Sequence, residues 1–101
     1  MIYLKNKDEL KELLKKDKVL VDFYADWCGP CNVLGTILDE IEKDIDVEIV
    51  KVNTDNFLSL AREYSILSIP NLKLFENGKL VKEQTGILSK DELIRWIEGD
   101  K

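Results

Sequence analysis

The chain has 101 residues, of which 45% are hydrophobic and 35% charged, a balance typical of one compact globular domain spanning residues 1–101. Its net charge of −5 disfavours nucleic acids and anionic membranes as partners, because both repel an acidic surface. The N-terminal segment has no long apolar run of the kind found in a signal peptide or a membrane span, so we expect a cytoplasmic protein.

The first third of the chain predicts a strand, a helix and a buried strand. Residues 1–5 favour a short first strand, and a helix is expected over about 7–16. Asn6 and Glu9 have the spacing of an N-cap and its capping-box partner, and leucines follow at helical spacing. The nearly continuous apolar run over 19–25 is typical of a strand that is covered on both faces.

The middle of the chain continues this alternation. A second helix should begin near Pro30, because proline fits the first turn of a helix, and its apolar spacing continues to Ile45. The β-branched residues of 47–52 predict a strand, and 58–64 predicts a short helix.

The last third predicts a hairpin and a final helix. A strand over 72–75 runs into Asn77-Gly78, a strong hairpin signal, so the residues from Leu80 onward should return antiparallel. Ser89 and Glu92 have capping-box spacing at the start of the last helix. The residues expected to face inward from this helix are Leu93, Trp96 and Ile97.

The resulting order, β-α-β-α-β-α-β-β-α, indicates the fold class. Strands that alternate with helices pair in parallel through crossover connections, whereas the final hairpin is antiparallel. The sequence therefore predicts an α/β fold with a mixed sheet and helices on both of its faces.

The two cysteines, Cys28 and Cys31, are the only ones in the chain and lie within the segment FYADWCGPCN. A zinc or iron–sulfur site needs further ligands, and the chain has no histidine, so metal would require carboxylates or a second chain. A purely structural disulfide would close a loop of only four residues, where little chain entropy is removed. Redox chemistry is the third and favoured interpretation.

The spacing of the cysteines suits a dithiol that opens and closes. Residues three apart on a helix face each other, so the two sulfurs can bond with little backbone motion. Cys28 meets the N-terminus of the second helix, where exposed amides stabilise an anion and lower the pKa of a thiol. We therefore expect Cys28 to be the nucleophile and Cys31 to resolve the mixed disulfide.

The run Trp27-Cys28-Gly29-Pro30-Cys31 resembles the active site of the thioredoxin family, and the resemblance covers essentially the whole chain. It implies the thioredoxin fold, a central mixed five-stranded sheet flanked by four helices. It also implies a thiol–disulfide oxidoreductase that acts as a general protein disulfide reductase, as a monomer, with no cofactor or metal besides its own cysteine pair. The implied partners are protein disulfides and a flavoprotein or ferredoxin-linked thioredoxin reductase, because the chain has no Gly-rich dinucleotide motif of its own.

The resemblance also implies roles for two charged residues. Asp22 matches a buried acid that takes and returns the proton of Cys31, and Lys51 matches the lysine that pairs with this acid. From the residues alone, Asp22 could instead end a strand facing water, although it shares its face with Leu20 and Tyr24. A solvated position for Lys51 is equally open.

Four further residues are implied to bind the substrate. Pro70 matches a cis-proline that faces the cysteines, and the backbone of Ile69 is expected to pair with an extended substrate segment. Trp27 and Gly86 are expected to belong to an apolar docking surface with Ile87. Gly86 is equally compatible with a plain turn.

The chain departs from the family pattern at a few positions near this motif. Asn32 stands where a lysine or arginine is common, which removes one source of thiolate stabilisation. Gly35-Thr36 replaces Ala-Pro in the second helix, Tyr24 replaces a frequent Trp, and Asn71 replaces the usual Thr after the proline. None of these changes removes a reacting group.

Two rival functions remain open. A glutaredoxin-like enzyme would use glutathione, but Gly29-Pro30 between the cysteines and Trp27 before them argue against it. A non-catalytic thioredoxin-fold binding module would not depend on the thiol of Cys28.

Overall fold

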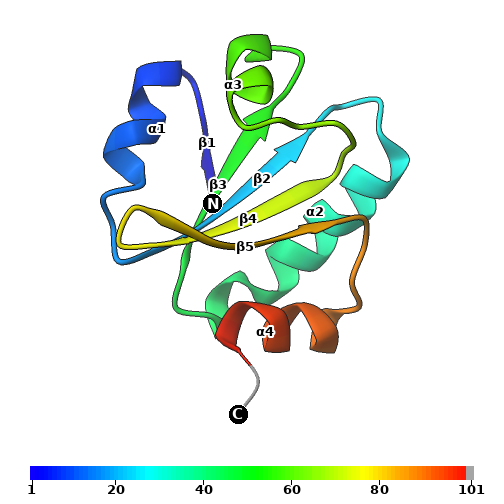
Figure 1. Cartoon of the computed structure of the whole chain (residues 1–101). Coiled ribbons are helices and arrows are strands. Elements are labelled where there is room, and N and C mark those ends of the chain that lie inside the picture. The colour runs from blue at the N-terminus through cyan, green and yellow to red at the C-terminus, as the bar shows by residue number, and fades with distance from the viewer. Residues whose placement is uncertain (100–101) are drawn as a thin grey trace.

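The computed structural model describes residues 1–99, so the expected domain range of 1–101 extends two residues beyond the described part. A single sheet runs through the molecule, with helices on both sides (Figure 1). Its strands are β1 (Ile2–Tyr3), β2 (Lys18–Tyr24), β3 (Glu48–Asn53), β4 (Asn71–Glu76) and β5 (Lys79–Thr85). The helices are α1 (Lys7–Leu13), α2 (Gly29–Ile41), α3 (Leu58–Glu63) and α4 (Lys90–Glu98), and a 3-10 turn, η1 (Glu42–Asp44), follows α2.

The sheet is mixed, as the sequence predicts. Its strand order is β1-β3-β2-β4-β5. β1, β3 and β2 are parallel, whereas β4 runs antiparallel to β2 and β5 antiparallel to β4. The β4–β5 hairpin turns at Asn77 and Gly78, whose φ angles of 53° and 83° are those of a type I′ turn. The five-stranded mixed sheet with four helices confirms the predicted fold class.

The core consists of two layers, one on each face of the sheet. Figure 1 shows α1 and α3 on one side of the strands and α2 and α4 on the other. Along β2, Val19, Val21 and Phe23 pack in the layer beneath α1 and α3, while Leu20 packs in the layer of α2 and α4. This burial on both faces explains why β2 has an almost continuous apolar sequence.

The ends of α1 differ from the expectation. Asn6 is the N-cap and its side chain accepts the Asp8 amide at 2.9 Å, but Glu9 accepts from the Lys5 amide at 3.3 Å and no capping box forms. The helix also ends at Leu13 rather than at residue 16, because the chain must turn there to enter β2. A local spacing pattern cannot anticipate that turn.

The other helix boundaries agree more closely with the sequence. α2 begins at Gly29, one residue before the expected Pro30, and ends at Ile41, after which the chain continues as the 3-10 turn η1 before reaching Ile45. The capping box of Ser89 and Glu92 is present at the start of α4, with both reciprocal hydrogen bonds formed. Across residues 1–99, the structure contains no helix whose length and apolar character would let it cross a membrane.

Candidate active site

The cysteines occupy the loop from β2 into α2. Cys28 is the N-cap residue of α2, and Gly29 and Pro30 form the start of the helix. The amide of Cys31 donates a hydrogen bond to Cys28 Sγ at 3.2 Å, and the Asn32 amide donates to the Cys28 carbonyl oxygen at 3.1 Å. The Cys28 sulfur therefore accepts a backbone amide at the positive end of the helix, which is the arrangement that stabilises a thiolate.

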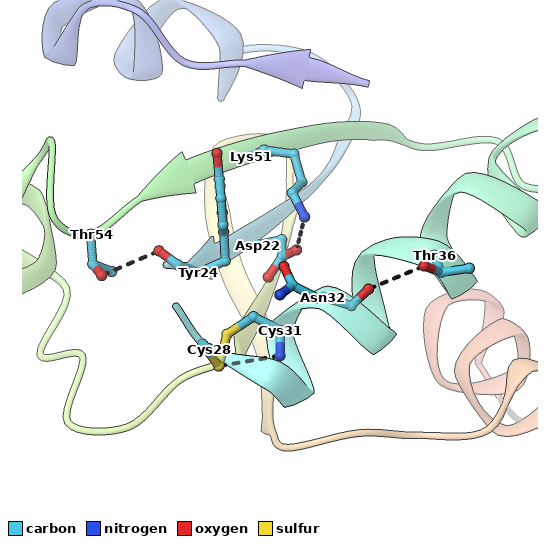
Figure 2. Close-up of polar contacts among 8 residues, drawn as sticks. All are labelled: Asp22, Tyr24, Cys28, Cys31, Asn32, Thr36, Lys51 and Thr54. Carbon is cyan, nitrogen blue, oxygen red and sulfur yellow. Dashed lines mark hydrogen bonds and ion pairs between the residues drawn. A yellow bond between two sulfur atoms is a disulfide. The ribbon is translucent and has the colours of Figure 1, made fainter. Parts of the chain in front are cut away.

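Cys28 and Cys31 are joined by a disulfide in the structure (Figure 2). Their Cα atoms are 5.2 Å apart, within the usual range for a disulfide, so one helical turn brings the sulfurs together. Both residues are buried, with exposed fractions of 5% for Cys28 and 2% for Cys31. Cys31 is therefore slightly more buried than Cys28. The pair can store two electrons as two thiols and release them when the bond forms.

Asp22 and Lys51 form a buried ion pair. They are register partners on β2 and β3, with Lys51 Nζ 2.7 Å from Asp22 Oδ2, and their side chains are 0% and 5% exposed. The alternatives in which Asp22 faces water or Lys51 is solvated are therefore wrong. Burial raises the pKa of Asp22 above its ordinary value, while the charge and the hydrogen bond of Lys51 act in the opposite direction.

The two carboxylate oxygens of Asp22 differ in their hydrogen bonding. Oδ1 is buried and accepts no hydrogen bond from the part of the chain that the structure describes. Along β2, Asp22 lies between Leu20, which packs in the layer of α2, and Tyr24, which packs against the cluster of Ala25, Cys28 and Cys31. In the view of Figure 2, Asp22 lies between Lys51 and Cys31. The structure thus places a protonatable oxygen on the side of the sheet that carries the disulfide.

The Ile69-Pro70 loop lies beside Cys28. The Ile69–Pro70 peptide bond is cis, as the family resemblance implies, and the Ile69 carbonyl oxygen is 4.0 Å from Cys28 Sγ. The amide of Gly86 donates to the Pro70 carbonyl oxygen at 3.0 Å. Gly86 has a φ of 84°, a left-handed conformation that favours glycine. The structure therefore brings together Cys28, Ile69, Pro70 and Gly86 from three separate parts of the sequence.

Trp27 presents its ring to solvent next to the cysteines. Its side chain is 72% exposed, and Nε1 donates a hydrogen bond to Asp55 Oδ2 at 2.9 Å. Sequence reasoning missed Asp55, because nothing in the segment after β3 distinguishes this acid from other surface acids. Asp55 fixes the indole edge and leaves the apolar face available for contact.

Two of the residues that depart from the family pattern, Asn32 and Thr36, make local hydrogen bonds near the start of α2. The Asn32 side-chain amide donates to the Asp26 carbonyl oxygen at 3.4 Å and so ties α2 to the loop before it. Unlike a lysine or arginine at this position, it brings no positive charge. The Thr36 hydroxyl donates to the Asn32 carbonyl oxygen at 3.2 Å, a bond within one helical turn. Asn71, at the start of β4, is buried, and its Oδ1 has no partner among residues 1–99.

Sequence reasoning also missed the environment of Lys51. Its Nζ lies 4.4 Å from the centroid of the Tyr24 ring, and a Cβ placed on Gly35 would lie 3.4 Å from the same atom. The contact of Lys51 with the Tyr24 ring had a signal in the sequence, because Asp22 and Tyr24 share one face of β2. The proximity of Lys51 to Gly35 had no such signal. Within residues 1–99, no three potential metal ligands of the Cys, Asp and Glu types lie close enough together to hold an ion.

Comparison with known proteins agrees with this geometry. A family model described as Thioredoxin matches residues 1–99. The chain is 44% identical over 95 residues to a thioredoxin of Mycoplasmoides gallisepticum, a match that covers 92% of this chain and 95% of that protein. It is also 44% identical over 90 residues to a thioredoxin of Rickettsia felis, covering 86% of each.

Solved structures of similar proteins have the same fold. A mutant thioredoxin from Halobacterium salinarum superposes with a TM-score of 0.90 at 36% identity, covering 96% of this chain and 87% of that one. The oxidised mitochondrial thioredoxin 3 of Saccharomyces cerevisiae gives a TM-score of 0.85 at 32% identity, covering 97% and 93%. The geometry agrees with these matches, because the Cys28 sulfur at the start of α2 forms a disulfide with Cys31 one helical turn along. The chain belongs to the thioredoxin family and is a thiol–disulfide oxidoreductase, a protein disulfide reductase whose redox-active pair is Cys28 and Cys31.

Proposed function

We propose that the chain is a general protein disulfide reductase in which Cys28 attacks the substrate and Cys31 resolves the intermediate. The Cys28 thiolate attacks one sulfur of a substrate disulfide, and the other substrate sulfur leaves as a thiolate. Cys31 then loses its proton and attacks Cys28 Sγ, which releases the second substrate sulfur. The substrate gains two electrons and the Cys28–Cys31 pair loses two.

One observation carries this assignment of roles. The Cys31 amide points at Cys28 Sγ from 3.2 Å, so the helix N-terminus stabilises negative charge on Cys28 and not on Cys31. Thiol–disulfide exchange proceeds through the thiolate, so the sulfur with the stabilised anion attacks first. Cys31 lies one turn along the same helix, within bonding reach.

Asp22 is the proposed proton acceptor for Cys31. Its Oδ2 is held by Lys51 at 2.7 Å, whereas Oδ1 is buried without a hydrogen-bond donor among residues 1–99, so the proton would reside on Oδ1. The raised pKa of Asp22, caused mainly by burial, brings this carboxyl closer to neutral pH, where a general base is most effective. Lys51 limits the rise by stabilising the carboxylate.

Substrate binding is proposed at the surface that surrounds Cys28. An extended substrate segment would pair with the backbone of Ile69, next to Pro70 and Gly86, as in strand addition. The Ile69 carbonyl lies 4.0 Å from Cys28 Sγ, which supports this position for the backbone beside the scissile disulfide. The exposed ring of Trp27 and the exposed side chain of Ile87 would supply apolar contact.

Regeneration requires an external electron donor. We infer a thioredoxin reductase, either a flavoprotein or a ferredoxin-linked enzyme, because the sequence carries no Gly-rich dinucleotide motif. A reductase cycle also needs a compartment in which thiols are kept reduced, so we place the protein in the cytoplasm.

A coupled assay tests the general function. Reduction of insulin is followed with a flavoprotein thioredoxin reductase and NADPH, and in parallel with glutathione and glutathione reductase. We expect turnover in the first system, none with Cys28→Ser, and a trapped mixed disulfide with Cys31→Ser. Turnover only with glutathione would favour the glutaredoxin-like alternative. Full rescue of a reductase-dependent strain by Cys28→Ser would favour the binding module.

The role of Asp22 needs a separate kinetic test. With Asp22→Ala, the rate of mixed-disulfide resolution near neutral pH should fall more than the rate of the first attack. Asp26→Ala is the matched control, because Asp26 is an exposed carboxylate in the same loop. Equal slowing of the two steps would remove Asp22 from the proposed mechanism.

A further inference from the structure

The ammonium group of Lys51 lies in a small site built by three residues, two from β2 and one from α2. Asp22 of β2 accepts its hydrogen bond at 2.7 Å, and the ring of Tyr24 lies 4.4 Å from Nζ. The third wall is the backbone of α2 at Gly35, where an added Cβ would be 3.4 Å from Nζ. Figure 2 shows Lys51, Asp22 and Tyr24 together beside the start of α2.

The Tyr24 ring and the backbone at Gly35 both affect how well the ammonium charge of Lys51 is stabilised. An ammonium group has three N–H donors, and only the bond to Asp22 is seen for Lys51 within residues 1–99. The face of an aromatic ring attracts a cation at this distance, so Tyr24 partly replaces the water that Lys51 has lost. A methyl group at position 35 would touch Nζ and add only apolar surface.

Glycine inside a helix is otherwise hard to explain. Gly35 lies in the middle of α2, where alanine is the better helix former, and its φ is not in the left-handed region. Lys51 Nζ is the one atom that an added Cβ would meet within 4 Å. An added Cβ would be in van der Waals contact with the ammonium group, so the missing side chain bears on the space around Nζ and not on the backbone conformation.

We propose that Gly35 and Tyr24 are positioning residues that hold the Lys51 ammonium against the Asp22 carboxylate. The proposal rests on the role proposed above for Asp22. By keeping Lys51 in place, Gly35 and Tyr24 stabilise the charged form of Asp22 and set the pH at which this carboxyl accepts a proton. Beside the pair in the sheet lie Tyr3 of β1, the register partner of Lys51, and Leu72 of β4, the register partner of Asp22, while α2 carries the titratable Cys31 in the cluster that Tyr24 packs against.

The test is a direct titration of the Asp22 carboxyl by carbon-13 NMR in the oxidised protein, where the two cysteines do not titrate. Gly35→Ala and Tyr24→Leu should each raise the pKa of Asp22 by about 0.5, roughly a threefold change in proton affinity and the size of a single cation–π contact. Gly35→Ala is expected to fold, because alanine is the better helix residue.

Two matched variants separate positioning from general structural change. Thr36→Ala changes the neighbouring residue of α2, which is exposed, and should leave the pKa of Asp22 unchanged. Tyr24→Phe retains the ring and should keep the wild-type value. If Gly35→Ala and Tyr24→Leu titrate like these two controls, the proposal is overturned.

The same variants distinguish this proposal from the proposed function of Asp22. In the reduced protein, the pH midpoint of mixed-disulfide resolution should move upward with the carboxyl pKa. A shifted pKa with an unshifted rate profile would count against Asp22 as the base and still support the positioning role. An unshifted pKa, together with slow resolution in Asp22→Ala, would reject the positioning role alone.

Discussion

Replacing Asp22 by asparagine should stabilise the protein at neutral pH. The carboxylate is fully buried, and burial raises its pKa above the ordinary value of 3.8 despite the opposing effect of Lys51. The folded state therefore binds the Asp22 proton more tightly than the unfolded state does. Above the folded pKa, wild type must keep a disfavoured charge inside the protein, whereas asparagine is neutral and can still accept a hydrogen bond from Lys51.

The size of the effect follows from proton linkage. Between pH 3.8 and the folded pKa, the folded state holds one proton that the unfolded state has released. The free energy of unfolding of wild type then falls, relative to Asp22→Asn, by at most about 1.4 kcal/mol per pH unit. The advantage of the variant is absent below both pKa values, grows through this window and is constant above the folded pKa.

The assay is urea unfolding of the oxidised proteins, followed by circular dichroism between pH 3 and pH 8. The oxidised form is chosen because its cysteines do not titrate. Asp26→Asn is the control, since Asp26 is exposed in the loop after β2 and should show no such pH-dependent gain. A gain of Asp22→Asn that is equal at all pH values, or largest at pH 3, would refute the reasoning.

Three further changes test the packing and charge arguments. Glu83→Gln should lower Tm at neutral pH, because it removes the charge that pairs at 3.1 Å with Lys73, whose side chain is 4% exposed. This pairing lowers the pKa of Glu83, so the difference in Tm between the variant and wild type should shrink as the pH falls through that pKa. Leu38→Ala in the core should destabilise by about 2–5 kcal/mol in urea unfolding, whereas Leu58→Ala, at an exposed position, should change stability by less than about 0.5 kcal/mol. Ser89→Ala should lose about 1 kcal/mol with the capping box of α4, measured by thermal unfolding, and equal stability would contradict the role of that cap.

Most of the fold was predictable because its signals are local. The continuous apolar run of β2, the Asn77-Gly78 turn and the Ser89 cap each depend on residues within a few positions of one another, and all three agree with the structure. The end of α1 was not predictable in this way. Leucine spacing allows the helix to continue, but the chain leaves it at Leu13 to reach β2.

In the candidate site, too, the local features were predictable and the contacts between separate elements were not. The placement of Cys28 and Cys31 on one helical turn followed from their spacing and from Pro30, so the sulfur at the helix N-terminus was predictable from ten consecutive residues. The contacts of Trp27 with Asp55 and of Lys51 with Gly35 were not, because each joins separate elements and depends on how α2 lies against the sheet.

The sequence by itself determined the order of the elements and a reactive cysteine pair at the start of a helix, since both rest on interactions between near neighbours in the chain. Only the tertiary structure decided that Asp22 is buried beside Lys51, 29 positions away, and that Ile69 lies next to Cys28, 41 positions away. The physical reason is that sheet register and helix packing bring distant residues together. Burial in that packed interior then changes the charge properties of Asp22, which its place in the sequence alone does not fix.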